Sequence, residues 1–119
     1  MKWSEGAAYA HITSNETIEG IRWAEFPKTA APLVADMSSD IFSRPFDINR
    51  FGLVYAGAQK NMGPAGVTLV IIRKDLVERV NEKIPVIFRY KTHADNDSMY
   101  NTPPCFPIYI VMLVTRWLL

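Results

Sequence analysis

Residues 53–72, LVYAGAQKNMGPAGVTLVII, contain two short apolar runs with a lysine and several small residues between them. The run at 67–72 is apolar on both faces, which is typical of a strand buried in a parallel or mixed sheet. Gly63 and Gly66 permit a tight turn with positive φ between the runs. The stretch therefore predicts two strands, at 53–56 and 67–72, with the lysine on their connection.

Further apolar runs lie on either side of this stretch. Residues 7–13, AAYAHIT, predict a strand that ends in turn-forming residues, and residues 33–35 form another short apolar run. Residues 74–82 place leucine and valine on one side of a modest helical pattern. This mixture of apolar strands and helices predicts an α/β layer architecture.

The last part of the chain contains a polar, proline-containing stretch followed by an apolar one. Residues 85–104 contain three prolines and a polar stretch, so an irregular connection is expected. Thr102 and Pro103 fit the N-cap and the first position of a final helix. Residues 106–115, FPIYIVMLVT, are almost wholly apolar but too short to span a bilayer, which needs about 20 residues. A buried helix is therefore expected there.

Size and composition exclude several classes of protein. A chain of 119 residues with 49% hydrophobic residues is expected to form one globular domain at most. A formal net charge of +1 provides no general field for nucleic acid or an anionic membrane. The single cysteine, Cys105, and the lack of a signal-peptide pattern favour a reducing, cytoplasmic compartment. His11 and His93 have no partners at metal-ligand spacing, so no metal site is predicted.

Three polar groups share one placement along the chain. Residues 15–17, Asp36 and the pair Gln59 and Lys60 each follow a short apolar run. In open α/β sheets, ligands bind at the carboxyl ends of the strands. If the runs are neighbouring strands, these groups converge on one site.

Two interpretations of Lys60 stay open from its surroundings. It is either a solvated loop lysine or an amine in a narrow pocket, where burial favours the neutral, nucleophilic form. A phosphate-binding P-loop is excluded because its lysine follows the second glycine, whereas Lys60 precedes Gly63.

Asp36 and Thr102 are open to two interpretations as well. Asp36 is either a turn or N-cap residue, or a buried anion that faces a positively charged ring nitrogen. A lysine for a Schiff base and an acid for the pyridinium nitrogen are the pair that pyridoxal phosphate requires. The Thr102 hydroxyl is either a plain helix cap or an anion ligand at a helix N-terminus.

Three stretches carry a family resemblance: HITSNETIEGIRW at 11–23, VADMSSDIFSRPFDINRFGLVYAGAQKNMGPAGVTLVIIRKDL at 34–76, and DNDSMYNTPPCFPIY at 95–109. Together they resemble the phosphoserine aminotransferases of the class V pyridoxal-phosphate family. The AGAQKN and YNTPP segments favour this family over cysteine desulfurases and serine–glyoxylate transaminases. The resemblance implies fold type I, with residues 1–119 as a single incomplete domain. That domain is part of the cofactor-binding large domain, a mixed, mostly parallel sheet with flanking helices.

The resemblance also implies a role for individual residues. Lys60 would be the Schiff-base lysine, and its freed amine would move a proton between the substrate α-carbon and the cofactor. Asp36 would pair with the pyridinium nitrogen of pyridoxal 5′-phosphate. Thr17 would hydrogen-bond near the phenolic oxygen, and Gln59 would contact the phosphate.

Further implications concern partners and pathway. Asn101 and Thr102 would reach the cofactor phosphate of the other subunit, which implies a homodimer. The implied reaction is amino transfer between glutamate and 3-phosphohydroxypyruvate in serine biosynthesis, with no nucleic-acid or membrane partner. The alternative is a truncated, non-catalytic fragment or isoform of that enzyme, acting at most as an interaction partner.

Overall fold

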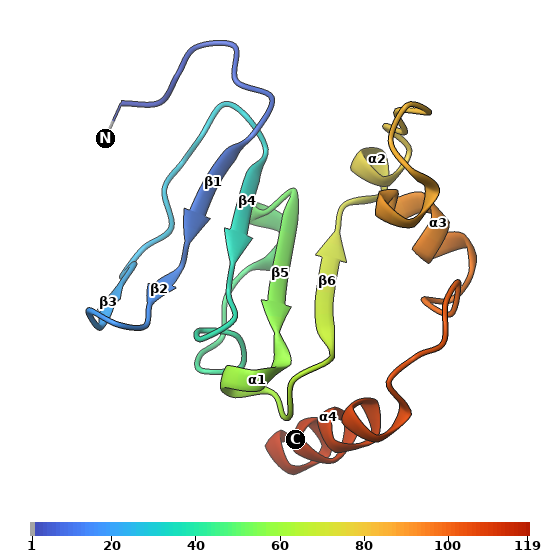
Figure 1. Ribbon diagram of the computed structural model, residues 1–119. Helices are drawn as coiled ribbons and strands as arrows, with labels where there is room; N and C mark the ends of the chain where they lie inside the picture. The colour runs from blue at the N-terminus through green and yellow to red at the C-terminus, as the bar shows by residue number, and fades with distance from the viewer. Residues whose placement is uncertain (1) are drawn as a thin grey trace.

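The main feature of the fold is a four-stranded sheet, seen in a computed structural model that describes residues 2–119. Met1, which the predicted domain 1–119 includes, lies outside the described residues. Neighbouring strands follow the order β1-β4-β5-β6, and Figure 1 shows them side by side. Their bounds are Ala10–Thr13, Leu33–Asp36, Leu53–Gly57 and Thr68–Ile72. β1, β4 and β5 are parallel and β6 is antiparallel, so the predicted mixed, mostly parallel sheet is confirmed.

The register of the parallel strands aligns their carboxyl ends. Thr13 pairs with Asp36, and Asp36 pairs with Tyr55 on the next strand. Two backbone bonds extend this alignment beyond the strands, from Ser14 N to Asp36 O and from Met37 N to Tyr55 O, at 2.9 and 2.8 Å. The chain segments that leave the three strands therefore start from one edge of the sheet.

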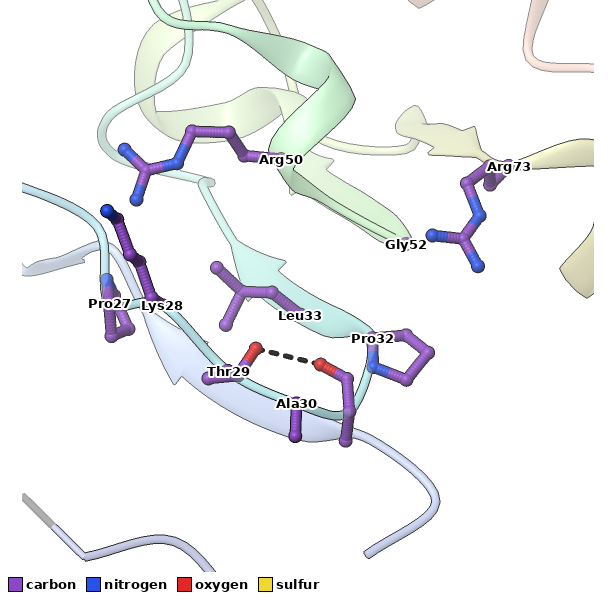
Figure 2. A pocket seen from close by; sticks show the side chains of 10 residues that line it. Pro27, Lys28, Thr29, Ala30, Pro32, Leu33, Arg50, Gly52 and Arg73 are labelled. Carbon is purple, nitrogen blue, oxygen red and sulfur yellow. Dashed lines mark hydrogen bonds between the residues drawn. The ribbon is translucent and has the colours of Figure 1, made fainter.

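The opposite edge of the sheet holds a separate hollow, drawn in Figure 2. It lies where β4 and β5 begin, and Lys28, Arg50 and Arg73 give it a basic character. Two of these cations already have partners, because Arg50 donates to Phe26 O at 2.5 Å and Arg73 binds Asp75. This hollow is thus at the far end of the strands from the predicted site.

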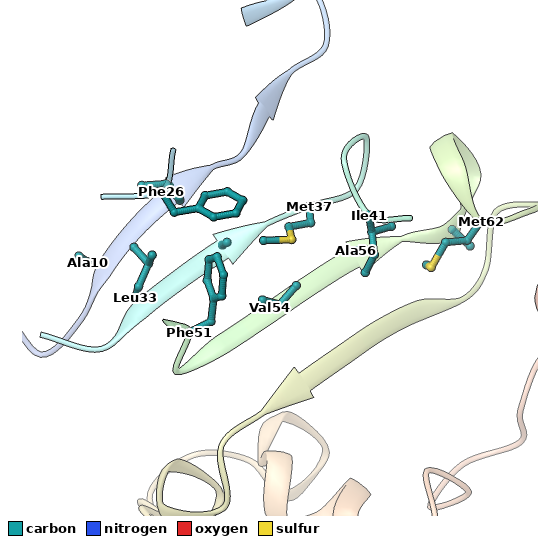
Figure 3. Packing of buried hydrophobic residues seen from close by; sticks show 12 residues of the cluster. Ala10, Phe26, Leu33, Met37, Ile41, Phe51, Val54, Ala56 and Met62 are labelled. Carbon is teal, nitrogen blue, oxygen red and sulfur yellow. The ribbon is translucent and has the colours of Figure 1, made fainter. Parts of the chain in front are cut away.

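The hydrophobic core covers one face of the sheet (Figure 3). Burial alternates along the strands, as expected for a sheet with one packed face. The strand side chains of this face meet residues from the connections and from α1. The buried set comprises Ala10, Ile12, Leu33, Ala35, Val54, Ala56, Phe26, Met37, Ile41, Phe51, Ala58 and Met62. Phe51 packs edge-to-face against Phe26 and Phe46, with ring centroids 4.9 and 5.7 Å apart.

The other face of the sheet is only partly covered by the described residues. Val34, Tyr55 and Ile72 are half-buried there and line a shallow groove with His11. β6 is an edge strand with exposed Thr68 and Ile71, so the expectation that 67–72 is buried on both faces is wrong for this part of the chain. The reason is that β6 pairs with β5 alone among the described strands.

Short elements complete the fold, and several differ from expectation. They are β2 Asn15–Glu16, β3 Ile21–Arg22, η1 Ile48–Arg50, α1 Ala58–Asn61, α2 Lys74–Val77, η2 Val86–Phe88, α3 Tyr90–Asp95 and α4 Cys105–Leu118. The strand predicted at 7–13 begins only at Ala10. The helix predicted at 74–82 is a single turn, which has little stability of its own. The irregular connection predicted at 85–104 contains α3, which sequence analysis missed.

The last helix starts later and is less buried than predicted. α4 begins at Cys105, with Pro104 at the N-cap position, so the predicted cap at Thr102 is wrong. The reason is steric, because Pro103, the predicted first helical residue, precedes Pro104 and is disfavoured in the helical region. No residue of α4 is buried, so the expected buried helix is also wrong for the part of the chain described here. Of the helices within residues 2–119, none is long and apolar enough to cross a membrane.

Candidate functional site

The carboxyl edge of the sheet brings together the polar groups singled out in the sequence. β1 leads into residues 14–17, β4 ends at Asp36, and β5 leads directly into α1, which carries Gln59 and Lys60. Because the three strands are parallel neighbours, these segments leave the sheet at the same edge. The predicted convergence is confirmed for Lys60 and Thr17, which are in direct contact.

The contact between Lys60 and Thr17 is the central feature of this edge. Lys60 Nζ donates a hydrogen bond of 2.8 Å to Thr17 Oγ1, across 43 positions of sequence. Thr17 Oγ1 in turn donates to Ser39 Oγ at 3.0 Å. Lys60 and Thr17 are both exposed, so the amine is accessible to a ligand from solvent. Lys60 is therefore a solvent-facing lysine that is nevertheless held by a specific partner.

The helical turn that carries Lys60 is held in place by the hydrophobic core and by neighbouring backbone groups. Ala58 and Met62 are fully buried on either side of the lysine, and Ala58 N donates to Val67 O at 2.9 Å. Asn61 Nδ2 donates to Ile41 O, which ties the same turn to the segment after β4. The isolated turn is too short to be stable, so these contacts determine where the Lys60 amine lies.

The glycines after Lys60 close the connection to β6. Gly66 has φ of +109°, a conformation that L residues with a side chain rarely adopt. Gly63 approaches α4 so closely that a Cβ there would lie 3.3 Å from Val111 Cγ2. The turn predicted from Gly63 and Gly66 is confirmed, and α4 packs against it.

Asp36 occupies the end of β4 in a half-buried position. Its Oδ1 accepts a hydrogen bond of 2.9 Å from Ser38 N, as expected of a turn residue, and the role of Asp36 toward a ring nitrogen stays a prediction. Next to it, Tyr55 Oη lies 3.1 Å from His11 Nε2. Burial raises the pKa of Tyr55, and the negative charge of Asp36 adds to the rise. Both effects favour the neutral phenol over the phenolate at this position.

The remaining predicted residues are placed differently. Gln59 is exposed and folds back over Gly57, where a Cβ would lie 2.8 Å from Gln59 Oε1. Asn101 and Thr102 are exposed on the segment between α3 and α4. Among the hydrogen bonds of residues 2–119, none joins either of them to Lys60, so the structure does not bring them into this group.

Sequence analysis missed Ser39 and the serine before it. Ser38 Oγ accepts from Gly57 N at 3.0 Å, which links the end of β5 to the loop after β4. Ser39 bonds to both Asn15 and Thr17. The signal was the pair of serines directly after Asp36, at a carboxyl end where hydroxyls bind neighbouring loops.

Comparison with known proteins agrees with this geometry. Residues 2–119 match the model of the family described as aminotransferase class-V. The chain belongs to the class-V aminotransferase family. Because the match extends over nearly all of the chain, the family assignment covers both the Lys60 edge and α4.

Two curated relatives of this class-V aminotransferase chain are both named phosphoserine aminotransferase. This chain is 58% identical over 117 residues to the phosphoserine aminotransferase of Geobacillus kaustophilus. The alignment covers 98% of this chain and 32% of that protein. This chain is 62% identical to the phosphoserine aminotransferase of Syntrophobacter fumaroxidans, covering 99% of itself and 33% of the relative. The chain thus spans about a third of the length of the curated relatives it matches.

Solved structures of phosphoserine aminotransferases also resemble this fold. The phosphoserine aminotransferase from Bacillus circulans subsp. alkalophilus matches with a TM-score of 0.94 at 58% identity. The pyridoxal-phosphate-bound enzyme from Trichomonas vaginalis matches with a TM-score of 0.91 at 47% identity. Each match covers 98% of this chain, and 33% and 34% of the respective structures, so the fold corresponds to part of theirs.

Proposed function

We propose that this chain is the cofactor-holding part of a phosphoserine aminotransferase. The reaction would be amino transfer between glutamate and 3-phosphohydroxypyruvate, with pyridoxal 5′-phosphate as cofactor. The observation that carries the proposal is the Lys60–Thr17 hydrogen bond at the carboxyl edge of the parallel strands. The name shared by the relatives supports the choice of substrates.

The donor groups at this edge suit the chemistry of pyridoxal phosphate. The cofactor carries an aldehyde, a ring nitrogen, a phenolic oxygen and a phosphate. The edge offers the amine of Lys60, the carboxylate of Asp36, the hydroxyl of Thr17 and the amide of Gln59. A primary amine and an acid are the two groups that this cofactor requires, and both are present.

Each of these residues would have a separate role toward the cofactor. Lys60 would hold the cofactor covalently and later carry a proton at the substrate α-carbon. Asp36 would hold a proton on the ring nitrogen, and Thr17 would orient the ring through its phenolic oxygen. Gln59, which is exposed on α1, would contact the phosphate. When bound, the cofactor itself supplies the electron sink.

The proposal extends to assembly and pathway. Residues 1–119 would form a single incomplete domain, part of the cofactor-binding large domain. Asn101 and Thr102 would serve the cofactor phosphate of a second subunit in a homodimer, and their exposure on the α3–α4 segment leaves them accessible for it. The enzyme would act in serine biosynthesis in the cytoplasm.

The first test is covalent capture of the cofactor. The 119-residue chain is mixed with pyridoxal phosphate, reduced with borohydride, digested and mapped by mass spectrometry. We expect the adduct on Lys60 and its loss in Lys60→Ala. Lys74→Ala is the matched control, since Lys74 is an exposed lysine at the start of another one-turn helix. Equal labelling of Lys60 and Lys74 would refute the cofactor role.

The second test concerns the reaction. Residues 2–119 replace the matching segment of the Geobacillus kaustophilus relative, and the hybrid is assayed with glutamate and 3-phosphohydroxypyruvate. We expect activity that Lys60→Ala abolishes. A hybrid that binds the cofactor at Lys60 but fails with these substrates would exclude this substrate pair. If neither test succeeds, the exposed apolar side chains of α4, among them Phe106 and Trp117, favour the role of an interaction partner.

A further inference from the structure

Ser39 makes more hydrogen bonds than any role in a simple turn requires. Its hydroxyl accepts from Asn15 Nδ2 at 3.0 Å and from Thr17 Oγ1 at 3.0 Å. It donates its single proton to Asn15 O at 3.0 Å. A serine hydroxyl has one donor and two acceptor positions, so all three are used.

The saturation of Ser39 fixes the direction of the next bond. Because the Ser39 proton goes to the Asn15 carbonyl, Ser39 can only accept from Thr17. Thr17 must therefore turn its own proton toward Ser39 and its lone pairs toward the other side. On that side lies Lys60 Nζ, at 2.8 Å, and a protonated lysine amine has donors but no acceptor. The chain of donors thus runs in one direction, from Lys60 through Thr17 and Ser39 to the Asn15 carbonyl.

We propose that Ser39 is a positioning residue, which holds the Thr17 hydroxyl as an acceptor directed at the Lys60 amine. Ser39 is half-buried, whereas Thr17 is exposed and follows β2, a strand of two residues. Little else restrains the Thr17 side chain, since within residues 2–119 its hydroxyl forms hydrogen bonds with Lys60 and Ser39 alone. An effect of Ser39 on cofactor capture at Lys60 rests on the proposed function, but the effect of Ser39 on the orientation of Thr17 does not.

The orientation of Thr17 is tested without cofactor. Threonine methyl groups of the 119-residue chain are labelled with carbon-13, and three-bond couplings report the χ1 rotamer of Thr17. We expect a single rotamer in the wild type and in Ser39→Thr, which keeps the hydroxyl. Ser39→Ala should give averaged couplings for Thr17 and unchanged couplings for Thr115, whose hydroxyl bonds Val111 O within α4. Ser43→Ala is the matched control, because Ser43 bonds Asp40 and not Thr17.

Cofactor capture provides the second readout. At limiting pyridoxal phosphate, Ser39→Ala should reduce the borohydride-fixed adduct on Lys60 by about fivefold, the effect of one neutral hydrogen bond. Ser39→Thr should restore it. A Thr17 rotamer that is averaged in the wild type, or single in Ser39→Ala, would overturn the proposal, and so would an unchanged adduct in Ser39→Ala. If the rotamer responds as expected but the wild type captures no cofactor, the role of Ser39 stands and the proposed function fails.

Discussion

Replacement of Gly57 by alanine should separate the stability of the fold from the placement of Gln59. Gly57 ends β5 with φ of −72° and ψ of 130°, an extended conformation open to any residue. The three atoms nearest to an added Cβ all belong to Gln59, with Oε1 at 2.8 Å and Nε2 at 2.9 Å. These atoms form the end of a flexible, exposed side chain that can move aside.

The expected effect on stability is therefore small and favourable. Alanine restricts the unfolded chain more than glycine does, which stabilises the folded state by about 0.4–1 kcal/mol where the conformation is compatible. The displaced Gln59 amide would no longer lie over Gly57, so retention of pyridoxal phosphate should fall. Both quantities are measurable on one preparation, by urea unfolding followed through tryptophan fluorescence and by cofactor capture at Lys60.

Gly52→Ala is the contrasting variant. Its Cβ would lie 2.8 Å from both Leu76 Cδ1 and Pro32 Cβ, and the proline ring cannot swing away. We expect Gly52→Ala to lower the free energy of unfolding by about 1–3 kcal/mol, the range of overpacking. The double variant Gly57→Ala with Gln59→Ala should keep the stability gain. If Gly57→Ala is destabilising and Gln59→Ala does not relieve it, the account of Gly57 is wrong.

Three further predictions concern the core and the charged groups. Phe51→Ala removes the centre of the three-ring cluster and should cost about 3–5 kcal/mol in urea unfolding, with a smaller loss for Phe51→Leu. Burial, with Asp36, raises the pKa of Tyr55 in the folded state, so its contribution to stability is present below about pH 10 and lost as pH rises through the folded value. Tyr55→Phe should flatten that alkaline loss in thermal unfolding. The hydrogen bond from Arg73 lowers the pKa of Asp75 below 3.8 in the folded state. The contribution of Asp75 to folding stability is therefore present above pH 3.8 and lost as the pH falls through the folded value. Asp75→Asn should weaken this loss of stability when unfolding is followed in acid titrations.

The sequence specifies the sheet and the position of Lys60 because both depend on local patterns. Short apolar runs followed by polar groups predict strands and their carboxyl ends, and parallel pairing then brings Thr17 to Lys60. The glycines after Lys60 likewise specify a turn through their own backbone freedom. The strands and the turn need no knowledge of distant contacts, whereas the contact of Thr17 with Lys60 also needs the parallel pairing of the strands.

Other features escape a local analysis for identifiable reasons. α3, with the sequence YKTHAD, is mostly polar and carries no apolar periodicity. The start of α4 depends on competition between an N-cap at Thr102 and the steric effect of consecutive prolines. Ser39 acts on Thr17 across 22 positions, so its role depends on how two loops meet.

The two sides of the Lys60–Thr17 contact are held by different means. On one side, Lys60 extends from a helical turn whose neighbours Ala58 and Met62 are buried in the core, so its position depends on apolar packing. On the other side, Thr17 is exposed after a two-residue strand and depends on a single serine. Packing involves many contacts and tolerates small changes, whereas a lone hydroxyl is either present or absent. Substitutions that misplace the contact without unfolding the chain should therefore concentrate at Ser39 and Thr17, and those at Ala58 or Met62 should act through stability.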